Sequence, residues 1–155
     1  MRQKLALLLA TGLCVGFIKG APGTYASILT GAAIFMTQRL GHRIAPELYV
    51  TVLCLVTVLG VLASDDVSRS RGAHDPSFVV IDEIAGQMVA LLFVPVTLVN
   101  AIAGIALFRA FDIWKPLGIR RLERLKDGVG IMADDLAAGF LTCLILHAAN
   151  WSFSR

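Results

Sequence analysis

Charge is scarce in this chain. Lysine, arginine, aspartate and glutamate together make up 16% of its 155 residues, whereas 57% are hydrophobic. An ordinary soluble domain contains about 25% charged residues. The mean hydropathy of +0.76 is therefore typical of a protein built for a lipid bilayer. The length fits a single domain over residues 1–155.

Cysteine is also scarce, and Cys14, Cys54 and Cys143 all lie inside apolar runs. Their spacing fits neither a metal site nor a disulfide framework, so we interpret them as small core residues. The sequence has no internal repeats or low-complexity tracts. It also lacks basic residues interleaved with aromatics, and its net charge is only +3. We therefore expect no nucleic-acid partner.

Long uncharged runs are what the chain does contain. Five segments carry no Asp, Glu, Lys or Arg: 5–18, 20–38, 48–64, 84–108 and 136–154. A helix needs about 20 mostly apolar residues to span a bilayer. Run 84–108 contains Pro95, and we favour a hairpin of helices over 78–95 and 97–114 rather than one kinked span. The predicted fold is all-α, a compact membrane-embedded bundle of about five or six helices.

The N-terminal run has two interpretations. The basic start "MRQK" followed by the apolar run 5–18 resembles a signal peptide. The small residues that follow, "KGAPGTYAS", form a poor cleavage site. We therefore expect a retained helix that is shallow or lies at the membrane interface.

The acidic residues indicate a topology. Ten of the eleven acids lie in 65–83 and 112–135, and Glu47 is the exception. Because these segments alternate with the apolar runs, we expect them on one face of the bundle, with 39–47 on the other. Basic residues are denser on the first face, which makes it cytoplasmic by the positive-inside rule. The basic, amphipathic stretch 119–126 is expected to lie along anionic headgroups.

Four polar stretches carry the candidate chemistry, and the first is "GAPGTYAS", residues 20–27. Pro22 and Gly23 predict a turn, and Thr24 and Ser27 place hydroxyls just before a helix. The free N–H groups at such a helix start suit a phosphate. From this stretch alone, however, a plain N-cap by Thr24 or Ser27 is the favoured interpretation.

The second stretch is "HDPSFVVIDEIAGQ", residues 74–87. Asp82 and Glu83 are adjacent, so on a helix they diverge by about 100°. Two carboxylates beside an apolar interior suggest a hard divalent cation, and Gly86 leaves room for a ligand or a neighbouring helix. The alternative is a pair of solvated acids at a helix start. His74 is either a phosphate partner or an exposed loop residue.

The third stretch is "FRAFDIWKP", residues 108–116. A helix would align Arg109, Asp112 and Lys115 on one side because they are three residues apart. Two cations beside an acid fit a clamp that holds a phosphate over a metal ion. An intrahelical ion pair with an interfacial Trp114 explains the same pattern, and the sequence does not decide between them.

The fourth stretch is "GVGIMADDLAAGF", residues 128–140. Gly128 and Gly130 predict a tight turn, after which Asp134 and Asp135 begin an apolar helix. Each acidic cluster alone could be a helix start. Three clusters on one predicted face, all next to Arg or Lys, indicate a metal-phosphate site instead. Magnesium is typically held by a few carboxylates together with phosphate oxygens and water.

Together the four stretches resemble the phosphatidylglycerophosphatase A family. They match "PGT" with a nearby serine, "HD…VxDExxG", "FRxxDxxKP" and "GxGIMxDDxxAG", in family order from about residue 20 to 140. The resemblance implies a Mg²⁺-dependent lipid phosphatase of the bacterial inner membrane that converts phosphatidylglycerophosphate to phosphatidylglycerol. The chain departs from the family pattern after Pro116, in "DGVG" and at Ala26, which are turn and packing positions.

Residue roles follow as hypotheses. The metal ligands are Asp82, Glu83, Asp134 and Asp135. Asp112 is a further ligand or the base, so the catalytic set is Asp82, Asp112, Asp134 and Asp135. The phosphate is bound by Thr24, His74, Arg109 and Lys115. The nucleophile is either a water oriented by a carboxylate or an aspartate that is phosphorylated transiently.

The competing hypothesis is a small membrane transporter or ion-conducting protein. In that case the acids would line a conduction pathway instead of an active site. The expected partners of the phosphatase are a membrane phospholipid substrate and the bilayer itself. The sequence leaves the oligomeric state open.

Overall fold

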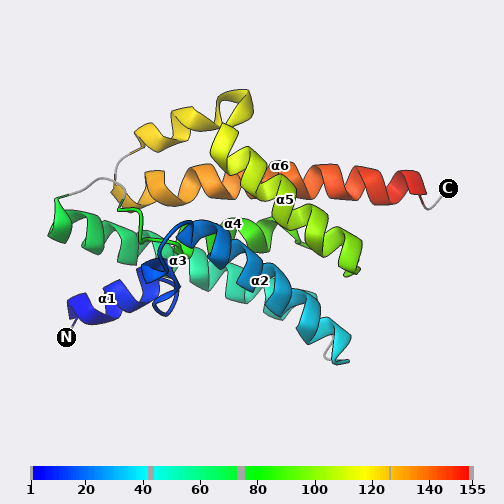
Figure 1. Ribbon diagram of the computed structural model, residues 1–155, viewed down its shortest axis with the longest axis horizontal. Helices are drawn as coiled ribbons and strands as arrows, with labels where there is room; N and C mark the ends of the chain where they lie inside the picture. Colours follow the sequence, from blue (N-terminus) through cyan, green and yellow to red (C-terminus); the bar gives the residue numbers. More distant parts are fainter. Residues whose placement is uncertain (1, 42–43, 73–75, 126, 154–155) are drawn as a thin grey trace.

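The computed structural model describes residues 2–41, 44–72, 76–125 and 127–153, and all regular structure in these ranges is helical (Figure 1). The elements are α1 (Arg2–Ala10), η1 (Val15–Phe17), α2 (Pro22–Arg39), α3 (Pro46–Arg71), α4 (Ile81–Ala90), α5 (Leu98–Trp114), η2 (Pro116–Arg124) and α6 (Asp127–Phe153), where η marks a 3₁₀ segment. The all-α prediction is confirmed, and the six α-helices of the described ranges match the expected number.

The long helices alternate in direction. In Figure 1, α2 and α6 run from left to right, whereas α3 and α5 return from right to left. The end of α3, the start of α4, η2 and the start of α6 therefore gather at the left of the view. This arrangement brings the described parts of the acidic segments 65–83 and 112–135 to one end of the bundle, as the alternation of polar and apolar segments predicts.

The short helix α4 lies at the centre of the fold. It packs against α2, α3, α5 and α6, and seven of its ten residues are buried. A ten-residue helix is about 15 Å long, which is half the hydrocarbon thickness of a bilayer. The hairpin prediction is therefore right about the turn before α5 but wrong about the length of its first helix. Residues before Ile81 are not helical because the Val80 N–H instead donates to the Ala10 carbonyl, at 2.8 Å.

The N-terminal run is built into this core. Ala10 and Thr11 are fully buried. The run is not one helix, because α1 ends at Ala10 and a turn leads to η1. Phe17 of η1 lies against the ring of Phe78, with ring centroids 5.8 Å apart, so this turn holds the stretch before α4.

The start of α6 corrects one prediction. Gly128 and Gly130 lie inside the helix, which begins at Asp127, and they form no turn. A Cβ atom on Gly128 would lie 2.0 Å from the Val61 carbonyl oxygen, so this glycine permits close packing of α6 on α3. Asp134 and Asp135 consequently lie two turns into the helix, where neighbouring helices cover them.

Two helices in the described ranges are long and apolar enough to cross a membrane, over Pro46–Arg71 and Gly128–Ser152. Only 22% of the apolar window of α3 is buried inside the protein. Leu55, Val58 and Leu62 on this helix are among its exposed large side chains. A continuous exposed apolar surface of this kind marks a membrane or protein contact.

Candidate active site

A polar cavity of about 240 Å³ lies between the starts of α2 and α4, the last turns of α5 and the first turns of α6. Its ionisable lining consists of the carboxylates of Asp82, Glu83, Asp112, Asp134 and Asp135 and the cationic side chains of Arg109 and Lys115. Every acid that the sequence assigned to the site therefore faces one cavity.

The first turn of α4 supplies two of the carboxylates. Asp82 and Glu83 follow Val80, the N-cap residue, which provides no side-chain cap. Acids at this position are favoured by the helix dipole, but Asp82 is buried and Glu83 is nearly so. The solvated alternative is therefore wrong. Burial raises the pKa of Glu83 above its usual value, and this effect outweighs a hydrogen bond with Asp82 and the nearby Arg109 charge.

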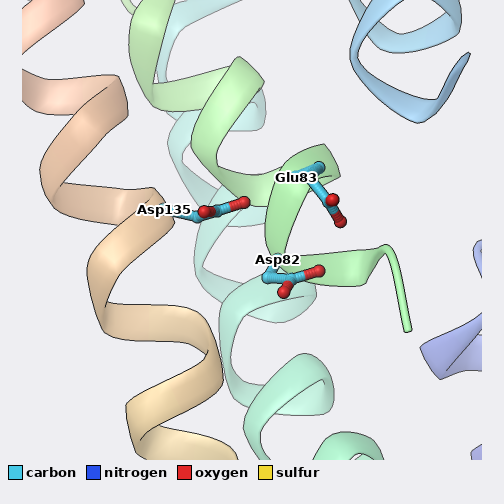
Figure 2. A group of neighbouring side chains, drawn as sticks. All are labelled: Asp82, Glu83 and Asp135. Carbon is cyan, nitrogen blue, oxygen red and sulfur yellow. The ribbon is translucent and has the colours of Figure 1, made fainter. Parts of the chain in front are cut away.

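The adjacent aspartates of α6 point to different partners. The Asp134 carboxylate accepts a hydrogen bond from the Lys115 ammonium. Asp135 reaches instead toward the first turn of α4, where Figure 2 shows its carboxylate beside those of Asp82 and Glu83. Neighbouring residues on a helix diverge by about 100°, so one pair of aspartates serves two parts of the cavity.

Arg109 links two helices at the cavity. Its Nη1 atom lies 2.6 Å from Asp112 Oδ2 within α5 and 3.5 Å from Glu83 Oε1 on α4. The predicted intrahelical ion pair is present, but the guanidinium also reaches across to α4. A planar group with several donors suits this bridging position.

Contrary to the prediction from its spacing, Lys115 is not aligned with Arg109 and Asp112 on one side of a helix, because it lies at the end of α5. It is the C-cap of α5 with φ of 47°, a left-handed conformation that is costly for a residue other than glycine. The turn aims its ammonium at Asp134 and at Glu123 of η2, whose Oε1 is 2.6 Å away. Burial alone would lower the pKa of Lys115, but these hydrogen bonds raise it above its usual value. The side chain is therefore a permanent cation at the cavity.

The start of α2 faces the same cavity through its backbone. Its N-cap, Ala21, offers no side-chain cap, and Ser27 donates its hydroxyl hydrogen to the Gly23 carbonyl within the helix. The N-cap interpretation of Thr24 and Ser27 is therefore wrong. A Cβ atom on Gly23 would lie 1.7 Å from Glu83 Oε1, so a glycine lets this helix end approach the carboxylates. An uncapped helix N-terminus at a cavity is suited to binding an anion.

The structure does not bring every predicted residue to the cavity. Thr24 does not line it, although Gly23 beside it does. His74 lies outside the described residues. Sequence reasoning overlooked Ser77, which lines the cavity, and Glu123, which pairs with Lys115. The only available signal was their position inside "HDPS" and "IRRLERLK", two stretches already marked as polar.

The carboxylates fall into two sets of possible metal ligands. Asp82, Glu83 and Asp135 each offer an oxygen within 4.8 Å of the others, and so do Asp112, Asp134 and Asp135. Within the described part of the chain, Glu83 Oε2, Asp134 Oδ1 and Asp135 Oδ2 are buried without a hydrogen-bond partner. A buried charged oxygen without a partner is costly, and carboxylate oxygens are the ligands that Mg²⁺ prefers. These residues therefore fit a divalent cation.

Comparison with known proteins decides the family. The family described as phosphatidylglycerophosphatase A matches residues 8–150. This chain belongs to that family. Phosphatidylglycerophosphatase A of Haemophilus influenzae is 35% identical, covering 93% of this chain and 88% of the relative. The Escherichia coli protein of the same name is 32% identical, covering 90% and 80%.

A third relative carries a different name. A putative phosphatidylinositol-3-phosphatase of Bacteroides thetaiotaomicron is 38% identical, covering 95% of this chain and 94% of the relative. No solved structure matches the chain. Membership of the phosphatidylglycerophosphatase A family makes the protein a phosphatase, a hydrolase of phosphoric monoesters. The resemblance that the four motifs carry is thereby confirmed, and all four lie within the matched residues.

Proposed function

We propose that the protein hydrolyses phosphatidylglycerophosphate to phosphatidylglycerol and phosphate, with Mg²⁺ as its cofactor. The observation that carries this proposal is the convergence of five carboxylates, two cations and the α2 N-terminus on one cavity. Two relatives named phosphatidylglycerophosphatase A support the choice of lipid. The relative named as a phosphatidylinositol-3-phosphatase makes that lipid the substrate to compare.

We place the enzyme in the bacterial inner membrane with its cavity on the cytoplasmic face. The exposed apolar surface of α3 and the length of α6 support a bilayer-spanning bundle. The cavity lies at the helix ends, which suits a substrate whose headgroup is at the interface while its acyl chains stay in the bilayer. The basic residues near the cavity support the cytoplasmic side.

The cavity residues would divide the work as follows. Asp82, Glu83, Asp134 and Asp135 would hold Mg²⁺, which when bound would offset charge on the phosphate and polarise its oxygens. Arg109 and Lys115 would bind the phosphate oxygens, helped by the backbone at the start of α2. Asp112, held by Arg109, would accept a hydrogen bond from the attacking water and orient it, or serve as a further ligand. Charge neutralisation of this kind is the main source of rate in phosphoryl transfer.

The test is phosphate release by the detergent-purified protein. We expect release from phosphatidylglycerophosphate in Mg²⁺ and none in EDTA, with slower release from phosphatidylinositol 3-phosphate and phosphatidic acid. Asp82→Asn and Asp134→Asn should each abolish release while circular dichroism stays unchanged. Asp66→Asn makes the same change on α3, outside the cavity lining, and should retain activity.

The transporter hypothesis makes the opposite prediction. It expects ion flux in protein-containing vesicles and no release of phosphate from any lipid. Full activity in EDTA would refute the metal requirement, and full activity of Asp82→Asn or Asp134→Asn would remove that residue from the site.

A further inference from the structure

Asp135 lies in a different electrostatic setting from the other acids of the cavity. It is 3% exposed, and its charge faces the carboxylates of Asp112, Glu83 and Asp134. Within the described part of the chain it forms no ion pair. Its side chain makes a hydrogen bond with that of Asp112, but its buried Oδ2 atom has no hydrogen-bond partner. A buried carboxylate surrounded by other ionised carboxylates is strongly unfavourable unless a cation joins them or a proton is shared between them.

Two neighbouring acids, Glu83 and Asp134, each have one carboxylate oxygen next to a cationic side chain. Arg109 lies beside Glu83 Oε1, and Lys115 pairs with Asp134 Oδ2. The second oxygen of each of these carboxylates, Glu83 Oε2 and Asp134 Oδ1, is buried without a hydrogen-bond partner. Arg109 and Lys115 therefore do not provide partners for all the carboxylate oxygens, and unpartnered oxygens of Glu83 and Asp134 remain near Asp135.

The two possible ligand sets share Asp135. One set joins it to Asp82 and Glu83 at the start of α4 (Figure 2), and the other joins it to Asp112 of α5 and Asp134 of α6. Only Asp135 belongs to both sets. A carboxylate has two oxygens and can hold one cation with each, so a shared aspartate is the ligand that a paired metal centre needs.

Charge balance supports two cations over one. Five carboxylates against two cationic side chains leave three negative charges in the lining when all are ionised. A phosphate monoester adds about −1.5 to −2 more. One divalent cation would leave about three negative charges with substrate bound, whereas two would leave about one. Paired cations in phosphatases stabilise both the attacking and the leaving oxygen.

We propose that this cavity binds two divalent cations and that Asp135 is the carboxylate that bridges them. Asp82 and Glu83 complete one cation site, and Asp112 and Asp134 complete the other. The proposal rests on the metal-dependent phosphatase function above, and it assigns Asp135 and Asp134 different roles. Asp134 serves one cation and Lys115, whereas Asp135 serves both cations.

The test measures metal binding without reference to turnover. The detergent-purified protein is stripped with chelator and titrated with Mn²⁺, which accepts the same oxygen ligands as Mg²⁺ and is paramagnetic. Equilibrium dialysis should give two Mn²⁺ per chain, and low-temperature electron paramagnetic resonance should show two coupled spins. One Mn²⁺ per chain with the spectrum of an isolated ion would overturn the proposal. The remaining negative charge of the cavity would then be reduced by protonation of its carboxylates.

Single substitutions separate the two cation sites. Glu83→Gln and Asp112→Asn should each retain one Mn²⁺ and lose the spin coupling, because each changes one site only. Asp135→Asn should lose the coupling and bind no more than one Mn²⁺. Asp66→Asn should still bind two coupled ions. Two coupled Mn²⁺ in folded Asp135→Asn would refute the bridging role, and the wild-type stoichiometry decides the number of ions even if that variant does not fold.

The two proposals can fail separately. A wild-type protein that binds one Mn²⁺ and hydrolyses phosphatidylglycerophosphate refutes the paired centre and leaves the proposed function intact. A protein that binds two coupled Mn²⁺ but releases no phosphate from any lipid tested refutes the proposed function and supports the paired centre.

Discussion

Gly86 of α4 and Gly139 of α6 lie against each other where the two helices cross. A Cβ atom on Gly139 would be 2.2 Å from the Gly86 carbonyl oxygen, and one on Gly86 would be 2.7 Å from the Asp135 carbonyl oxygen. The absence of both side chains lets the backbones approach closely, as in membrane helix pairs with small residues at the interface. This contact brings the Asp135 carboxylate to Asp82 and Glu83.

The first prediction concerns that crossing. Gly139→Ala should lower the thermal stability of the purified protein, because overpacking a close contact costs about 1–3 kcal/mol. It should also weaken Mn²⁺ binding by separating Asp135 from α4. Ala148→Val adds methyl groups at an exposed position of the same helix and should change neither property. Unchanged Mn²⁺ affinity in Gly139→Ala would show that the ligands do not depend on this spacing.

A second prediction concerns Lys115. Lys115→Met removes the permanent cation beside Asp134 and should lower kcat about 10²–10³-fold, the usual loss for one donor to a developing charge. Glu123→Gln removes the half-exposed partner of the same ammonium. It should change the rate by less than about fivefold, because an exposed ion pair contributes about 0–1 kcal/mol. Steady-state kinetics on both variants tests this, and equal losses would mean that Glu123 positions the lysine.

Arg109 provides a third prediction. Arg109→Lys keeps the charge but loses the planar group that reaches both Glu83 and Asp112, so kcat/KM should fall about 10–100-fold. Arg69→Lys is the matched change on α3, where the arginine pairs with Asp65 outside the cavity lining. It should have wild-type activity. If Arg109→Lys is equally active, a point charge is sufficient at this position.

The fourth prediction tests the orientation in the membrane. In a variant with the three native cysteines replaced, a cysteine at Arg120 of η2 should react with an impermeant maleimide only in inside-out vesicles. A cysteine at Leu40, just beyond α2, should react only in intact spheroplasts, because η2 and the end of α2 lie at opposite ends of the bundle (Figure 1). Labelling of both positions from the same side would contradict the proposed spanning arrangement.

Much of the helical framework could be predicted from hydropathy. The apolar runs became α2, α3, α5 and α6, and the described parts of the acidic segments lie at one end of the bundle because they alternate with those runs. Local pattern was less reliable where tertiary contacts compete with it. The Val80 N–H pairs with the Ala10 carbonyl of α1, and α4 starts only at Ile81; Gly128 packs against α3 instead of forming a turn.

The sequence by itself determined the identity and the common location of the charged groups, because the cost of placing charge in an apolar environment sorts segments by polarity. The tertiary structure decided which partner each charged side chain contacts. Asp134 and Asp135 are adjacent in the chain, yet one meets Lys115 and the other lies among the acids of α4 and α5. Helix crossings on small residues set those directions, and contacts between distant segments cannot be read from the local order of residues.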